Sequence, residues 1–217
     1  MGKRTNMNKV SVIIPYMQSD PDKPAVLNRL LDSLEGKGAD EILVIENWKE
    51  GYAVPINFGL SQAKGDYLVV MNDDLVLDCG FLDQLPDPNA VTSPLIDGNE
   101  QPFWGCCFCI PRWVYEMVGG LDERYRISYF DDDAYEMILR KNNIPLKSMP
   151  LVNFWNKDGG GRTLHSFSDH DIFFHENKRK FIEQWGAEPQ QLRDYHNKFN
   201  KMPSKNEAIV YFGIQLS

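Results

Sequence analysis

Two groups of neighbouring carboxylates carry the candidate chemistry of this sequence. The first is Asn72-Asp73-Asp74, which directly follows an apolar run at residues 67–71 that is typical of a buried strand. Parallel α/β sheets bind ligands beyond the carboxyl ends of their strands. Two carboxylates there suit a hard divalent cation, Mn²⁺ or Mg²⁺, which bridges to phosphate oxygens and neutralises charge on a leaving diphosphate. The alternative is a solvated acidic turn that caps the next helix.

Three consecutive aspartates, Asp131-Asp132-Asp133, form the second group, at the start of a helix expected over residues 133–142. Crowded carboxylates repel one another, so the pKa of at least one should rise. A carboxylate with a raised pKa suits a general base that takes a proton from an acceptor hydroxyl. The helix dipole also favours acidic residues at this end, which accounts more easily for one or two aspartates than for three.

The elements that must position these residues alternate in the first half of the chain. Strands are expected at 10–15, 41–45 and 67–71, and helices at 25–34 and 54–63. Such a series implies right-handed crossovers and a mainly parallel sheet. Residues 51–66 contain glycines that let the backbone approach a ligand, but neither the dinucleotide-binding nor the P-loop pattern is present.

The second half of the chain is less regular. Strands are expected at 90–94, 105–110 and 208–216, helices at 112–118, 133–142, 169–185 and 189–199, and a glycine-rich loop at 156–163. The sequence has neither an internal repeat nor a linker, so we expect one α/β domain over 1–217, with 1–8 as a disordered tail or a tag. The apolar end of the chain leaves open that this is a domain of a longer protein.

Charge and hydropathy exclude two classes of partner. The formal net charge of -8 makes nucleic acid an unfavourable partner, because an acidic surface repels a polyanion. No apolar run approaches the roughly 20 residues of a membrane span, and the run after the basic N-terminus is too short for a signal peptide. The sequence therefore predicts a cytoplasmic enzyme.

Four strings resemble family 2 glycosyltransferases, inverting enzymes with the GT-A fold. They are VSVIIPYMQSD, EILVIEN, NFGLSQAKGDYLVVMNDDLVL and GGLDERYRISYFDDDAYEMILR, within a resemblance that runs from about residue 10 to about residue 186. The most specific part, 57–77, is similar to the family's N-x-G-x-x-x-A-x-G-D-Y…N-D-D run. The resemblance implies a Rossmann-like GT-A domain that transfers a sugar from a nucleotide diphosphate, a UDP-sugar by family habit, to a hydroxyl on a glycan or glycoprotein. Similar domains occur in bacterial polysaccharide clusters and in large DNA viruses, where the enzyme would work in the host cytoplasm.

The resemblance also implies the residues of the donor site. Pro15 and Tyr16 end the first strand, where the family holds the nucleobase, and Tyr16 would stack on uracil. Glu46 stands where the family usually has an aspartate that binds the base. Asn57 and Gly65 belong to the glycine-containing string and are expected at the donor.

The metal and the general base follow from the same comparison. Asn72-Asp73-Asp74 matches the DXD-type motif, with Asp74 as the metal ligand and Asp73 at the ribose or a metal-bound water. His165, just past the glycine-rich loop, is a candidate third ligand.

Asp131 matches the catalytic base, with Asp132 next, but Phe130 replaces the family's glutamate and leaves the register of the three aspartates open. Two other functions remain. A sugar-1-phosphate nucleotidyltransferase should carry a basic glycine-rich signature near the first strand, which 12–22 lacks. A nucleotide-sugar-binding protein without turnover is kept open by Phe130.

Overall fold

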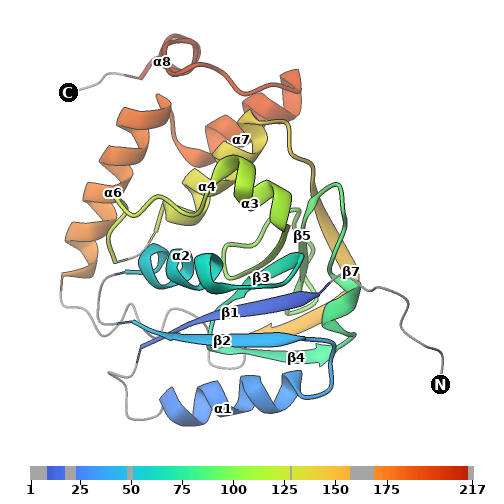
Figure 1. Ribbon diagram of the computed structural model, residues 1–217. Helices are drawn as coiled ribbons and strands as arrows, with labels where there is room; N and C mark the ends of the chain where they lie inside the picture. The colour runs from blue at the N-terminus through green and yellow to red at the C-terminus, as the bar shows by residue number, and fades with distance from the viewer. Residues whose placement is uncertain (1–8, 18–22, 48–50, 128, 157–168, 215–217) are drawn as a thin grey trace.

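A mixed seven-stranded sheet with helices on both faces forms the centre of the molecule (Figure 1). The computed structural model describes residues 9–17, 23–47, 51–127, 129–156 and 169–214. The strands are β1 (Val10–Tyr16), β2 (Glu41–Glu46), β3 (Tyr67–Met71), β4 (Leu75–Cys79), β5 (Val91–Ile96), β6 (Cys107–Pro111) and β7 (Leu146–Asn156). The helices are α1 (Lys23–Leu34), α2 (Ala53–Gln62), α3 (Arg112–Val118), α4 (Asp131–Lys141), α6 (His170–Trp185), α7 (Pro189–Phe199) and α8 (Lys205–Phe212), with a short 3₁₀ turn, η1 (Leu82–Gln84).

The sheet has the strand order β2-β1-β3-β6-β5-β7-β4. β1 lies parallel to both β2 and β3, as the first half of the sequence predicts. In the second half β5 is parallel to β7, whereas β6 is antiparallel to β3 and β5, and β4 is antiparallel to β7, so the sheet is mixed there and not mainly parallel. For β5 and β6 the cause is local, because the connection 97–106 between them is shorter than the dozen or more residues that a parallel crossover needs.

Two strands and one helix differ from the sequence-based expectation. The sequence does not predict β4 and β7, and residues 208–212 of the apolar run expected as a strand belong to the helix α8 instead. Ser204 starts this helix with a capping box: its hydroxyl accepts from Glu207 N, and the Glu207 carboxylate accepts from Ser204 N. α4 begins at Asp131, so all three aspartates lie in its first turn.

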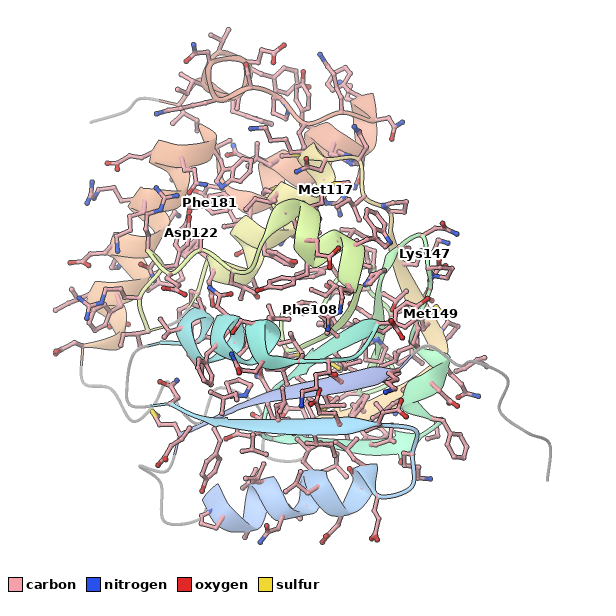
Figure 2. All side chains as sticks on the ribbon, in the orientation of Figure 1. Phe108, Met117, Asp122, Lys147, Met149 and Phe181 are labelled. Atoms are coloured by element: carbon pink, nitrogen blue, oxygen red, sulfur yellow. The ribbon has the colours of Figure 1, made fainter. Side chains whose placement is uncertain are left out.

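The core has a layer on each face of the sheet. Val10, Val12 and Ile14 of β1 point to the side covered by α1, while Ile13 points to the side covered by α2, α3 and α4. This alternation is the period of two of a strand buried on both faces. Phe108 of β6 lies in the second layer and is labelled in Figure 2.

A third cluster joins the helices to one another. Ala134 and Met137 of α4 pack against Phe181 of α6, Leu192 of α7 and Ala208 of α8. This cluster fixes the start of α4 relative to the sheet. None of the helices within the described ranges combines the length and apolar character that crossing a membrane requires.

Candidate functional site

The carboxyl ends of β1, β2 and β3 meet at one edge of the sheet because the three strands are parallel. Tyr16 pairs with Glu46 across β1 and β2, and the Asn47 amide donates to the Tyr16 carbonyl at 2.6 Å. The pKa of the Tyr16 phenol is raised by desolvation, and further by the negative charges of Asp73 and Glu46. The structure therefore brings these three predicted donor-site residues together, beside the buried Pro15.

Asn72-Asp73-Asp74 forms the turn between β3 and β4. Asp73 and Asp74 are buried, and the backbone N–H of Asn72 donates to the Cys106 carbonyl at 2.9 Å. The side-chain oxygen of Asn72 is buried without a hydrogen-bond partner among the described residues. A buried amide oxygen without a partner, beside two buried carboxylates, suits a ligand that supplies positive charge.

A hard divalent cation fits this turn. Within the described ranges, no three His, Cys, Asp or Glu side chains gather as a complete protein-made metal site. Mg²⁺ and similar cations at nucleotide sites are commonly held by one or two carboxylates, with substrate phosphates as further ligands. The donor set at 72–74 matches that arrangement.

Gly105 and Cys106, which we call the strap, lie between the two carboxylate groups. Burial raises the pKa of the Cys106 thiol to about 12, and the charges of Asp74, Asp132 and Asp97 add to this effect. The Asp132 carboxylate packs on Gly105, where a Cβ would stand 2.1 Å from Asp132 Oδ2. Residues about 60 positions apart in sequence therefore face one another across the strap.

The three aspartates at the start of α4 differ in environment. Asp131 is 2% exposed, its Oδ2 has no hydrogen-bond partner in the described part of the chain, and burial followed by the charge of Asp132 raises its pKa well above the ordinary value. Asp132 is partly exposed, and burial followed by the charge of Asp133 raises its pKa to about 6. Its Oδ1 accepts from the Asp133 amide at 2.9 Å.

Asp133 belongs to an ion-pair network between α4 and α7. Arg193 of α7 pairs with Asp133 and donates from Nε to Glu136 Oε2 at 2.8 Å. Arg140 donates to the other Glu136 oxygen at 2.8 Å. Burial raises the pKa of Asp133, while Arg193 opposes this rise. The network gives Asp133 a structural role.

Phe130, where the family pattern has glutamate, is a core residue. It is buried against Phe174 and Phe181 of α6, with ring centroids 5.5 and 5.7 Å apart. Phe181 is labelled in Figure 2. The replacement therefore serves the packing of α6 on the start of α4.

The backbone before α4 is strained. Ile127, Tyr129 and Phe130 have φ of 69°, 70° and 68°, in the left-handed region that bulky residues rarely adopt. The buried Asn177 of α6 holds this segment by donating to the Arg126 carbonyl at 2.9 Å and to the Tyr129 carbonyl at 3.4 Å. Such strain persists only where the surroundings over-determine it, and here it fixes the direction in which α4 starts.

Gly65 lies apart from the site that the sequence predicts for it, and Asn57 uses its side-chain amide inside the protein. Both amide hydrogens of Asn57 are used inside the protein, at 2.8 Å from Leu121 O and 2.8 Å from Glu123 Oε1. Gly65 lies at the opposite, amino end of the strands, where its amide donates to Ser11 Oγ at 2.7 Å. The five residues of β3 separate Gly65 from Asn72 by about 17 Å at about 3.3 Å per residue. We leave both out of the proposed donor site.

His165 and residues 157–163 of the glycine-rich loop lie outside the described residues. Sequence reasoning missed Tyr52, Gly105 and Asn177, which hold the site together through contacts between distant segments. The glycine before the cysteine run was the available signal for Gly105, and the sequence held none for Tyr52.

Comparison with known proteins gives matches at the level of structure. No family profile and no curated protein sequence matches this chain. The catalytic domain of Drosophila β1,4-galactosyltransferase 7, in complex with xylobiose, is similar with a TM-score of 0.54 at 17% identity over 65% of this chain and 65% of that one. The mannosyltransferase PcManGT from Pyrobaculum calidifontis, in complex with GDP-Man and Mn²⁺, is similar with a TM-score of 0.59 at 14% identity, over 95% of this chain and 69% of that one.

A third solved structure, GalNAc-T7 with UDP, GalNAc and Mn²⁺, gives a TM-score of 0.60 at 13% identity over 96% of this chain and 57% of that one. This chain thus spans about two thirds or less of the length of two of these proteins. The chain has the GT-A fold that these glycosyltransferases share, which confirms the predicted fold class.

Proposed function

We propose that this protein is a metal-dependent glycosyltransferase that moves a sugar from a nucleoside diphosphate to an acceptor hydroxyl. The observation that carries the proposal is that the strap lies near both carboxylate groups: the charges of Asp74 and Asp132 both raise the pKa of Cys106, and the Asp132 carboxylate packs on Gly105. Donor activation and acceptor deprotonation need two such groups on either side of a reacting carbon. Solved structures with the same fold hold UDP or GDP-Man together with Mn²⁺, which supports a nucleotide-sugar donor.

The donor half of the site would bind the nucleotide and its diphosphate. Asp74, with Asn72 and Asp73, would hold Mn²⁺ or Mg²⁺, whose charge would stabilise the diphosphate as it leaves. Tyr16 offers a ring on which a base stacks, and Glu46 offers a carboxylate that accepts from a base N–H. These two residues favour uracil, and we propose a UDP-sugar as the donor.

The acceptor half would supply the general base, and we assign that role to Asp132. A pKa of about 6 leaves its carboxylate ionised at neutral pH yet basic enough to take a proton. The resemblance to family 2 glycosyltransferases favours Asp131 as the base instead. Asp131 is only 2% exposed, and burial raises its pKa well above the ordinary value, so we assign the proton transfer to the more exposed Asp132 and a supporting role to Asp131.

Direct attack by the deprotonated hydroxyl on the anomeric carbon would invert its configuration, as in the family 2 enzymes that the sequence resembles. We propose this stereochemistry, with a hydroxyl of a glycan or glycoprotein as the acceptor. The packing of Phe130 against Phe174 and Phe181 gives this position a structural role in place of the glutamate of the family pattern.

Calorimetric titration of UDP tests the donor half. UDP should bind in Mn²⁺, and the affinity should fall by at least about tenfold, or about 1.4 kcal/mol, in EDTA or in Asp74→Asn. Asp194→Asn, the same change at an exposed position on α7, is the matched control and should bind as the wild type does. Equal UDP affinity in Mn²⁺ and EDTA would contradict the assignment of Asp74.

A further inference from the structure

Tyr52, just before α2, contacts the strap through its hydroxyl. Its hydroxyl donates to the Gly105 carbonyl at 3.0 Å, across 53 residues of sequence. Burial raises the pKa of this phenol well above its ordinary value, and the charges of Cys106, Asp131 and Asp132 add to the effect. The side chain therefore lies within the electrostatic field of the proposed base.

Backbone contacts hold the rest of the strap. The Cys106 carbonyl accepts from the Asn72 amide at 2.9 Å, which ties the strap to the turn that carries Asp74. The Cys107 amide donates to the Trp104 carbonyl at 3.1 Å and closes a turn around Gly105 and Cys106. Neither contact fixes the peptide that follows Gly105, whose carbonyl is held by Tyr52.

The position of Gly105 in turn determines that of Asp132. A Cβ on Gly105 would stand 2.1 Å from Asp132 Oδ2 and 2.7 Å from Cγ, so the carboxylate rests directly on the glycine backbone. A small movement of this peptide must move the carboxylate or open a gap beneath it. General-base catalysis is sensitive to such displacements, because the base must stay within hydrogen-bond reach of the acceptor hydroxyl.

We propose that Tyr52 is a positioning residue that, through Gly105, sets the place of the Asp132 carboxylate relative to the metal-binding Asp74. The catalytic half of this inference rests on the proposed function, whereas the coupling between Tyr52 and Asp132 does not. A hydrogen bond with a merely structural role would contribute to stability independently of Asp132.

A double-mutant cycle in thermal unfolding tests the coupling without any substrate. The variants are Tyr52→Phe, Asp132→Asn and their combination, measured near pH 8 in EDTA. Release of the strap lets the Asp132 carboxylate reach more water, so Asp132→Asn should raise Tm by about 2–4 °C less in the Tyr52→Phe protein than in the wild type. Additive Tm shifts would overturn the proposal.

Tyr135→Phe is the matched control. It also removes a tyrosine hydroxyl that donates to a glycine carbonyl, Gly119 O at 3.3 Å, and it lies on the same helix as Asp132. Its Tm shift should be additive with that of Asp132→Asn. A departure from additivity as large as that of Tyr52→Phe would mean that the coupling runs through α4 and would overturn the role of the strap.

Steady-state kinetics test the catalytic half. Tyr52→Phe should lower kcat about tenfold and leave KM for the donor within about twofold, because Asn72 and Asp74 remain anchored to β3. An unchanged kcat would overturn the positioning role. Absence of transfer by the wild type would count against the proposed function instead, and the unfolding cycle would still decide the coupling.

Discussion

Replacement of Asp132 with asparagine should stabilise the protein above pH 6 while it removes the proposed base. Burial against Gly105 raises the pKa of this carboxyl from 3.8 to about 6. Because the pKa in the folded state is the higher one, this group contributes its full stability below about pH 4 and loses it as the pH rises through about 6. The difference between these two pKa values corresponds to about 3 kcal/mol. Because the side chain is partly exposed to solvent, we expect Asp132→Asn to change the free energy of unfolding by about 1–2 kcal/mol.

Thermal unfolding of Asp132→Asn and wild type, near pH 4 and near pH 8 in EDTA, measures this effect. Asparagine keeps an oxygen that can accept from the Asp133 amide, so the cap survives. Tm should rise by about 3–6 °C at the higher pH and should hardly change at the lower one. Asp194→Asn should leave Tm unchanged at both.

Two results would refute this reasoning. An equal shift of Tm at both pH values would mean that the substitution acts through packing and not through ionisation. A loss of Tm at the higher pH would mean that the ionised carboxylate is stabilised in the folded state. In the same variant, kcat for sugar transfer should fall by about 10²–10⁴-fold, the usual cost of losing a general base.

The remaining predictions concern the cation, the strap and the helix start. Mn²⁺ with UDP should raise the Tm of the wild type, since a ligand that binds only the folded state stabilises it, and Asp74→Asn should lose this gain in differential scanning fluorimetry. Gly105→Ala should lower Tm through its clash with the Asp132 carboxylate, and less so when combined with Asp132→Ala; an equal loss in both proteins would contradict the contact. Phe130→Glu should cost about 3–5 kcal/mol in urea unfolding, since it buries an unpaired charge in an aromatic cluster, whereas a near-neutral result would exclude the packing role.

The sequence predicted the elements whose burial is uniform. β1 and β3 are continuous apolar runs because both faces are covered, and such runs stand out without any structural knowledge. β7 contains Lys147, Pro150 and Asn153 and has no clean alternation, because its surroundings change along its length. The apolar run at the end of the chain is ambiguous between strand and helix by composition alone, and the capping box at Ser204 was the signal that distinguishes them.

The site divides in the same way. Local sequence and the family resemblance proposed residues at strand ends or in a helix's first turn, such as Tyr16, Asp74 and Asp132. The hydrogen bond from Tyr52 to Gly105 joins segments 53 residues apart, and no local pattern encodes it. Gly65 was assigned to the donor because it belongs to the same string as Asp74, but β3 carries the two to opposite ends of the sheet.

Release of nucleoside diphosphate from a panel of sugar nucleotides, with Mn²⁺ and a mixture of glycan acceptors, tests the central claim most directly. The wild type should release UDP from at least one UDP-sugar, in an amount equal to that of a glycan whose mass increases by one sugar. EDTA, Asp74→Asn and Asp132→Asn should each abolish both the UDP release and the mass increase. Full release in EDTA, or tight binding of every sugar nucleotide with no product of increased mass, would contradict this claim.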